Sequence, residues 1–171
     1  IFIDLPARAI HLGFALLLVF LTFPFLRKHK DRKFNFFSII LSLFGLISTF
    51  YIFFDYDGLV DRNGILLEQK INFYSFSIIF PIELIIGLIG ITLLLEATRR
   101  SIGSPLVIVA LIFYLYSFFG QNMPEIISHQ GLSFNRLVGY HWFGGEAIFG
   151  IPISVSVSFV FLFVLFGSML D

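Results

Sequence analysis

The residues with the greatest capacity for chemistry are three ionisable side chains that fall inside apolar stretches. Glu83 stands shortly after Pro81 in one such stretch, and Arg8 precedes His11 by one helical turn in another. An ionisable group inside a membrane is costly, so a functional role is the default hypothesis for Glu83, with Arg8 or His11 as its partner. The alternative is a carboxylate in the first turn of a helix, where proline is common and the positive end of the helix dipole favours a negative charge.

A second charged group has the spacing of neighbours on one helix. Glu96 precedes Arg99 by three positions and Arg100 by four, so all three side chains share one helical face. Basic residues are also favourable in the last turn of a helix. We interpret the group as an ion pair that stabilises a helix end at the membrane surface. A direct functional role is the alternative.

The remaining polar residues predict neither an enzyme nor a metal site. The chain has no cysteine, which excludes disulfides, thiolate ligands and a cysteine nucleophile. No zinc-protease, serine-hydrolase, phosphate-loop or dinucleotide motif is present. Two polar sets are candidate metal ligands, and neither has the required spacing. The first, which misses the spacing of an EF-hand calcium loop, is Asp55, Asp57, Asp61 and Asn63. The second, which has no known ligand spacing, is His129, His141 and Glu146. We therefore predict no catalytic residue, no metal ligand and no cofactor.

The composition indicates a protein whose solvent is a lipid bilayer. Hydrophobic residues make up 58% of the chain and charged residues only 13%. Soluble domains have about 45–50% apolar and about 25% charged residues. The formal net charge is zero, so no overall field attracts nucleic acid. The lipid bilayer is a predicted partner, and nucleic acid is not.

Five apolar stretches predict an all-α membrane protein that is a fragment of a larger helical bundle. They are residues 5–26, 34–54, 73–97, 105–119 and 147–170. The third can begin at Ser75 and be kinked by Pro81, which we prefer, or begin at Pro81 with Glu83 in its first turn. Residues 132–143 predict an external interfacial helix, with Tyr140 and Trp142 at the depth of the lipid headgroups.

Basic residues predict the direction of each span. Residues 27–33 contain five of the eleven basic residues, and short basic loops stay in the cytoplasm. Arg99 and Arg100 mark a second cytoplasmic turn that agrees with the first. The N-terminal end of the fragment is then external. We predict a multi-pass protein of the cytoplasmic (inner) membrane.

Three motifs resemble one known family. Residues 94–100 read LLEATRR, and residues 145–152 read GEAIFGIP, followed by the apolar run 159–167. Upstream, residues 8–15 read RAIHLGFA before a helix that ends near Pro24. Together these stretches resemble the fused membrane subunit of tripartite ATP-independent periplasmic (TRAP) transporters, in its TAXI branch, over nearly the whole chain.

The resemblance implies that the chain contains portions of two different parts of the transporter. Residues 1–100 would be the scaffold helices of the small, Q-type part, with its first helix missing upstream, and residues 101–171 would start the large, M-type transport subunit. Such transporters take up organic anions, commonly carboxylates. An ion gradient drives the uptake, and a periplasmic binding protein delivers the anions. The substrate site would lie beyond Asp171, in the remaining M-type helices. We expect residues 55–72 and 120–145 to face the binding protein.

Two other interpretations stay open. The same apolar spans and loop charges fit a structural or assembly subunit of another multi-helix membrane complex. An intramembrane enzyme built on Glu83, His11 and Arg8 is the third interpretation, and it requires these side chains to gather in a water-filled pocket.

Overall fold

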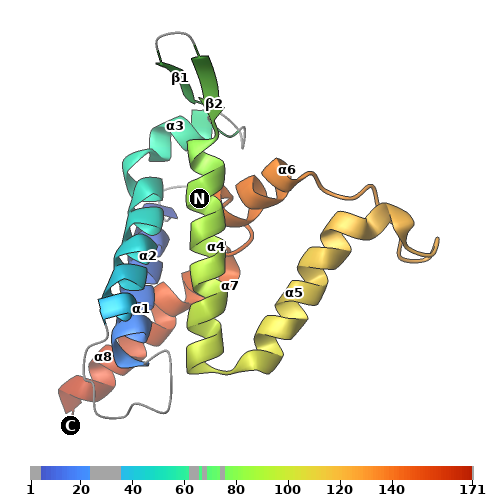
Figure 1. Cartoon of the computed structure of the whole chain (residues 1–171). Coiled ribbons are helices and arrows are strands. Elements are labelled where there is room, and N and C mark those ends of the chain that lie inside the picture. Colours follow the sequence, from blue (N-terminus) through green and yellow to red (C-terminus); the bar gives the residue numbers. More distant parts are fainter. Residues whose placement is uncertain (1–4, 24–35, 62–65, 67–68, 74–75, 171) are drawn as a thin grey trace.

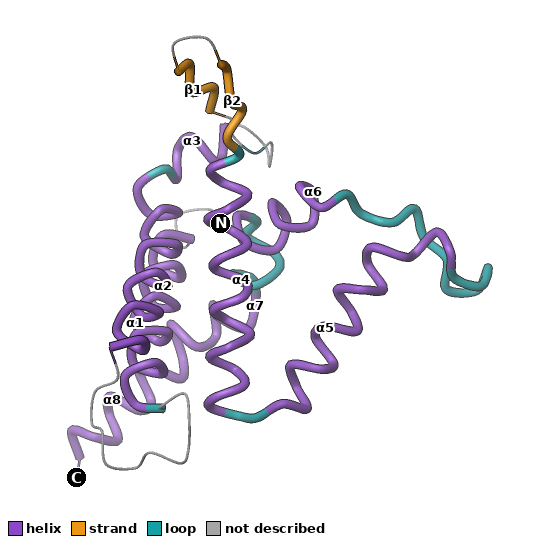
Figure 2. Tube along the Cα trace, in the orientation of Figure 1, coloured by secondary structure: helices purple, strands orange, loops and turns teal. Residues whose placement is uncertain are grey.

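The computed structural model describes residues 5–23, 36–61, 66, 69–73 and 76–170, and most of these residues are helical (Figures 1 and 2). The long helices are α1 (Leu5–Thr22), α2 (Phe36–Phe54), α4 (Ile82–Ser101) and α5 (Ser104–Phe119). A final helix is built from α7 (Ile151–Val155), a π-helical turn η4 (Ser156–Val160) and α8 (Phe161–Leu170). Shorter elements are α3 (Tyr56–Asp61), β1 (Gln69–Phe73), β2 (Phe76–Phe80), η2 (Gly120–Asn122), α6 (Phe134–Val138) and η3 (Gly139–Phe143).

Helices α1, α2 and α4 form the three-helix bundle that contains most of the buried core. α1 packs most extensively against α2, and α4 packs against both (Figure 1). The face of α2 towards the bundle consists mainly of small residues, and a Cβ added at Gly13 of α1 would lie 2.5 Å from Thr49 Oγ1. Small residues let helix backbones approach closely, as in other membrane bundles. Larger core side chains come from all three helices: Leu12, Leu16, Phe20, Ile52, Ile91 and Leu93.

In the part of the chain that the structure describes, four helical stretches are long and apolar enough to cross a membrane. They are Leu5–Thr22, Phe36–Phe54, Ser104–Asn122 and Ile151–Leu170. The predicted helical fold with several helices of membrane-spanning length and composition is therefore confirmed, but the predicted count of five is not. The fifth candidate, α4, is long enough but carries four charged residues: Glu83, Glu96, Arg99 and Arg100. Charged side chains inside the hydrocarbon region are costly, so α4 is not a simple apolar span.

The preferred prediction that the third helix begins at Ser75 and is kinked by Pro81 is wrong. Strand β2 occupies Phe76–Phe80 and pairs antiparallel with β1, and α4 begins only at Ile82, directly after Pro81. Proline disfavours the helical conformation of the residue before it and lacks the N–H that a helix interior requires. The alternative prediction, with Glu83 in the first turn, is the one that the structure supports. The hairpin itself was not predicted.

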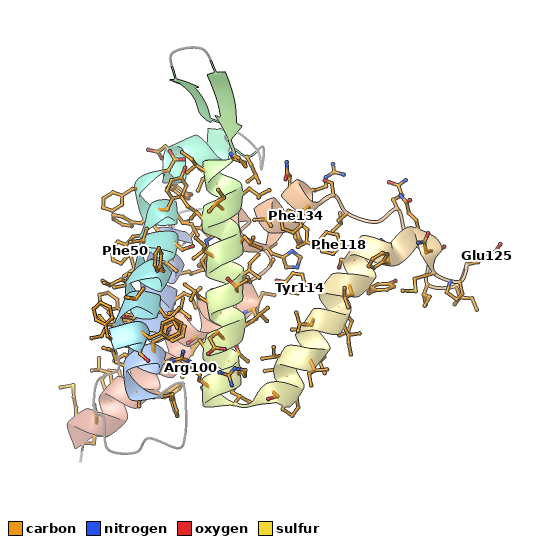
Figure 3. The ribbon with its side chains drawn as sticks, in the orientation of Figure 1. Phe50, Arg100, Tyr114, Phe118, Glu125 and Phe134 are labelled. Atoms are coloured by element: carbon orange, nitrogen blue, oxygen red, sulfur yellow. The ribbon has the colours of Figure 1, made fainter. Side chains whose placement is uncertain are left out.

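Helix α5 leaves the bundle after a sharp turn. Gly103 has φ +124°, a conformation that side-chain-bearing residues rarely adopt, and Pro105 lies in the first turn of α5. Beyond this turn α5 diverges from α4 (Figure 1), and no residue of α5 is buried. Its far end contacts α6 through Phe118 and Phe134, whose stacked rings have centroids 5.9 Å apart (Figure 3).

The final helix begins at Ile151, later than the predicted start of the fifth span. Residues 146–150 form turns, and Gly150 precedes a first helical turn that contains Pro152. Proline is common in the first turn of a helix, because the N–H that it lacks would have no partner within the helix there. Contacts with α1 come from α7, from the π-helical turn and from Phe161 at the start of α8. No residue of α8 is buried. The second half of this helix thus presents its apolar surface outward.

Candidate functional site

Glu83 lies at one end of the three-helix bundle and is completely buried, with 0% of its surface exposed. The hydroxyl group of Tyr51, in the last turn of α2, donates a hydrogen bond of 3.0 Å to Glu83 Oε1. The same hydroxyl oxygen lies 3.4 Å from Asp55 Oδ2. Because a tyrosine hydroxyl has one hydrogen, it donates to only one of these two carboxyl groups at a time. Tyr51 therefore joins a buried carboxyl group to a half-exposed one.

The position of Glu83 follows from how α4 begins. Pro81 ends the strand conformation, and Glu83 is the acidic residue of the first helical turn. The unpaired N–H groups of that turn give it a positive potential, which favours a carboxylate. α2 runs antiparallel to α4, so the end of α2 that carries Tyr51 lies beside the start of α4. Tyr51 was not singled out in the sequence, because nothing local distinguishes it from the other aromatic residues.

Arg8 and His11 attach the final helix to the bundle. Arg8 Nη1 donates a 2.8 Å hydrogen bond to the carbonyl oxygen of Phe149, in the turn before α7. His11 Nε2 lies 3.1 Å from Ser156 Oγ, at the start of the π-helical turn, and its ring meets Phe161 edge to face. These contacts hold the first half of the final helix against α1. The pairing of Glu83 with either residue stays a prediction.

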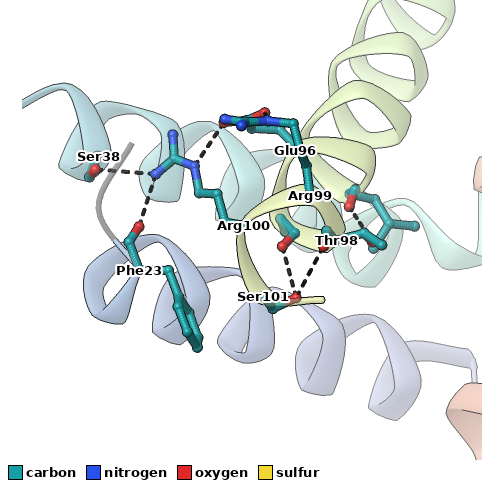
Figure 4. A network of polar contacts seen from close by, with 9 residues as sticks. Phe23, Ser38, Glu96, Thr98, Arg99, Arg100 and Ser101 are labelled. Atoms are coloured by element: carbon teal, nitrogen blue, oxygen red, sulfur yellow. Dashed lines mark hydrogen bonds and ion pairs between the residues drawn. The ribbon is translucent and has the colours of Figure 1, made fainter. Parts of the chain in front are cut away.

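The second polar cluster lies at the opposite end of the bundle, and it brings Glu96, Arg99 and Arg100 together as predicted (Figure 4). Glu96 accepts two hydrogen bonds from Arg99, at 2.7 and 2.8 Å. Arg100 Nε donates a third, at 2.8 Å. The two arginines differ in burial, since the side chain of Arg99 is 40% exposed and that of Arg100 only 2%. Only Arg100 is therefore shielded from solvent.

Arg100 also links α4 to the two other helices of the bundle. Its Nη1 lies 3.3 Å from both the carbonyl oxygen of Phe23, just after α1, and the hydroxyl oxygen of Ser38, in the first turn of α2 (Figure 4). Its guanidinium group lies 4.8 Å from the ring centroid of Phe20. A planar guanidinium with several fixed donors suits such a junction better than a lysine. The sequence predicted the ion pair but not this junction.

A third site is a notch in α4 that holds the only tryptophan of the chain. Trp142 of η3 is 0% exposed, and its Nε1 lies 3.4 Å from the carbonyl oxygen of Ser48. A Cβ at Gly90 would lie 2.1 Å from Trp142 Cζ2, and one at Gly87 would lie 2.5 Å from Val138 Cγ1. The two glycines, three residues apart, share one face of α4 and make room for the indole ring.

The notch corrects the prediction that Trp142 anchors an external helix at headgroup depth. The indole ring packs inside the protein, between α2 and α4, and Phe149 meets it edge to face at 5.6 Å. Tyr140, by contrast, is 51% exposed. An interfacial pattern and a helix with one buried aromatic face look alike in sequence, because both alternate aromatic and polar residues. The spacing of Gly87 and Gly90 was the signal that could have identified the notch.

Within the described part of the chain, no three His, Cys, Asp or Glu side chains are placed to hold a metal ion. The side chains of each polar cluster instead make hydrogen bonds that connect different helices. The basic stretch 27–33 lies outside the described residues. Comparisons of the chain with models of protein families, with curated proteins and with solved structures gave no match.

Proposed function

We propose that this chain is a membrane-embedded scaffold portion of an ion-gradient-driven secondary transporter of the TRAP type. In this proposal the transporter takes up organic anions such as carboxylates, which a periplasmic binding protein delivers. The chain lies in the cytoplasmic membrane, and the substrate is bound by helices that follow Asp171. The motifs that resemble the TAXI branch and the arrangement of the polar contacts support this assignment.

The observation that carries the proposal is that the buried polar residues connect helices to one another. Arg100 joins the ends of α1, α2 and α4, and Arg8 joins α1 to the turn before α7. Tyr51 and Glu83 join α2 to α4. A scaffold needs firm packing of this kind, because it must stay fixed while another part of the transporter moves.

The apolar surface of the chain supports the same assignment. α5 and α8 have no buried residue, although both belong to helices long enough to cross a membrane. A helix that is apolar all round is covered by lipid or by other membrane helices. The broad hydrophobic perimeter that results is what a fixed block in a bilayer requires.

The contacts also cross the proposed boundary between residues 1–100 and 101–171. Trp142 fills the notch of α4, and His11 meets Ser156. In the proposal, these two contacts fasten the start of the M-type part onto the Q-type helices. They make residues 134–160 a part of the fixed block.

An uptake experiment tests the proposal. The polypeptide that carries this chain is reconstituted in liposomes, and accumulation of labelled mono- and dicarboxylates is measured with a sodium or proton gradient. The binding protein is added or left out. We expect uptake that requires both the gradient and the binding protein and does not require ATP.

The competing interpretation, an assembly subunit of another membrane complex, predicts a different result. Such a subunit gives no uptake under any gradient and copurifies from mild detergent with other membrane subunits in a fixed ratio. Absence of uptake together with such a stoichiometric complex would overturn the transport proposal. Uptake driven by ATP in place of an ion gradient would overturn it as well.

A further inference from the structure

The segment that joins α5 to α6 folds back on the C-terminal end of α5. The N–H of Leu132 donates a 2.9 Å hydrogen bond to the carbonyl oxygen of Ser117, and the N–H of His129 donates one of 3.1 Å to that of Gly120. The last carbonyl groups of a helix have no partner within the helix. Residues 120–133, which we call the α5 cap, supply such partners.

The ring of His129 is at the centre of the α5 cap. Its Nε2 lies 3.1 Å from the carbonyl oxygen of Tyr116, and its Nδ1 lies 3.0 Å from the backbone nitrogen of Gly131. The ring also meets the ring of Tyr116 edge to face, with centroids 4.7 Å apart. It packs so closely on Gly120 that a Cβ there would lie 2.2 Å from His129 Cε1. Both ring nitrogens are therefore engaged.

The chemistry of these two partners determines the protonation state of His129. A carbonyl oxygen only accepts, so Nε2 must carry a hydrogen and donate to Tyr116. A backbone N–H only donates, so Nδ1 must be unprotonated to accept from Gly131. The closed α5 cap thus requires the neutral imidazole with its hydrogen on Nε2. A charged imidazolium would direct a second N–H against the N–H of Gly131.

The two other histidines in the described part of the chain have partners that tolerate a charge. His141 Nδ1 lies 2.9 Å from the carbonyl oxygen of Leu137, and a charged ring still donates to it. His11 Nε2 faces the hydroxyl group of Ser156, which can either donate or accept. Of these three histidines, only His129 has a contact that its protonation must break.

We propose that His129 is a proton-binding site that releases Gly131 from its ring when the pH falls, and so loosens the α5 cap at that point. A proton from water binds to Nδ1, the new N–H bond replaces the lone pair, and the hydrogen bond from Gly131 is lost. Because Nδ1 can bind this proton only when the Gly131 contact is broken, lower pH shifts the equilibrium towards the form in which that contact is broken. Histidine gains its charge between about pH 8 and about pH 5.

Other groups near His129 do not supply an alternative switch. The Tyr116 hydroxyl donates to the carbonyl oxygen of Ile127, and the amide of Gln121, which does not titrate, donates to the carbonyl oxygen of Gln130. Glu125 is exposed. The helix dipole at the end of α5 favours a positive ring and so assists protonation, but it does not remove the conflict between the new N–H and the N–H of Gly131. The contact with Gly131 therefore decides the response.

An apolar tip of the α5 cap stays attached to α5 in both protonation states. Ile126, which is 97% exposed, and Ile127 lie in the turn that the Tyr116 hydroxyl and the His129 ring tie to α5. Neither of these two contacts requires an unprotonated Nδ1, so the change with pH is confined to the segment at Gly131. The inference depends on the geometry of the cap alone and holds whether or not the protein is a transporter.

The test is a nitrogen-15 magnetic resonance titration of the whole chain in lipid nanodiscs. Ring nitrogens of histidine and the amide of Gly131 are followed from about pH 8 to about pH 5. At neutral pH we expect the His129 ring with hydrogen on Nε2 only. As His129 gains its proton, the Gly131 amide signal should move in step with it.

Two variants complete the experiment. His129→Gln removes the titrating ring, so the Gly131 amide should no longer respond to pH, whether or not the cap stays closed. His141→Gln removes a histidine whose contact tolerates a charge, so the response of Gly131 should persist. Hydrogen on Nδ1 of His129 at neutral pH, or protonation of His129 without a change at Gly131, would overturn the proposal.

Discussion

At the scale of single residues, the buried polar side chains matter because each connects two or three helices. Arg99 and Arg100 show how an exposed polar side chain differs from a buried one. Both bind Glu96, but only Arg100 is shielded from water. A solvent-exposed ion pair contributes little to stability. A buried arginine that also binds groups on two other helices contributes more, because its removal leaves their polar atoms without a donor.

We predict that Arg100→Ala destabilises the protein by about 1–3 kcal/mol, the cost of leaving buried polar groups unsatisfied. The larger penalty of an uncompensated buried charge does not arise, because Glu96 is partly exposed and keeps Arg99. Thermal unfolding in detergent, followed by circular dichroism, measures the effect. Arg99→Ala is the matched control and should change the unfolding temperature little; equal effects of the two variants would contradict the prediction.

A second residue-scale prediction concerns the carboxyl group of Glu83. Tyr51→Phe removes the hydroxyl donor from a carboxyl group that has no access to solvent, which should cost about 1–3 kcal/mol. Chemical denaturation of the purified protein measures this loss. Tyr140→Phe, at a half-exposed ring, serves as the control.

A double-mutant cycle makes the prediction for Tyr51 specific. If the hydroxyl acts through Glu83, Tyr51→Phe should cost less when Glu83→Gln is already present, because the two residues share one hydrogen bond. Strictly additive effects of the two substitutions would show that the hydroxyl stabilises the protein through other atoms.

At the scale of elements, the start and packing of α4 organise the bundle. Pro81 decides where α4 begins, and that start places Glu83 next to the end of α2. Gly87 and Gly90 then open one face of α4 to η3, so that a short helix far along the chain packs against the middle of the bundle. The indole ring fills the space that a side chain at Gly90 would occupy.

We predict that Gly90→Ala forces Trp142 out of its position and destabilises the protein by about 1–3 kcal/mol, the usual cost of overpacking. The chain has one tryptophan, so its fluorescence reports on this site directly. The emission should shift to longer wavelength as the indole ring meets water or lipid headgroups. An unchanged spectrum with unchanged stability would refute the packing of the notch.

Gly167→Ala provides the matched control for Gly90→Ala. A Cβ at Gly167 of α8 meets nothing within 4 Å, so the substitution adds a better helix former without a clash. It should leave the tryptophan emission unchanged and stabilise the helix by up to about 1 kcal/mol.

At the scale of the whole molecule, the two polar clusters lie at opposite ends of the bundle. Glu83 and Tyr51 are at one end, and Arg100 is at the other. The excess of basic residues in stretch 27–33 predicts that the Arg100 end faces the cytoplasm. The α5 cap then faces the outside, because α5 runs back from the Arg100 end.

This orientation gives a prediction for single-cysteine variants in intact cells, since the chain has no cysteine of its own. Glu125→Cys should react with a membrane-impermeant thiol reagent added outside. Lys30→Cys should react only after the membrane is permeabilised. The reverse pattern would invert the orientation, and with it the assignment of residues 55–72 and 120–145 to the side of the binding protein.

The sequence by itself determined the membrane-helix class, most of the helices and the ion pair of Glu96 with the two arginines. These features depend on local properties: the length of apolar runs and the spacing of side chains along one helix. The sequence left the start of α4 open, because Pro81 and Glu83 fit either a kinked helix or a new one. It did not indicate the β1–β2 hairpin, since the apolar strand 76–80 reads as part of a span.

Only the tertiary structure decided which residues meet across the bundle. Tyr51 with Glu83, Arg100 with Ser38, and the indole ring in the α4 notch join residues that lie 32, 62 and about 50 positions apart. Such contacts depend on how the helices pack, on which helix faces carry small residues and on where the chain reverses direction. Periodicity along one helix contains none of that information, because it fixes which residues share a face but not what that face touches.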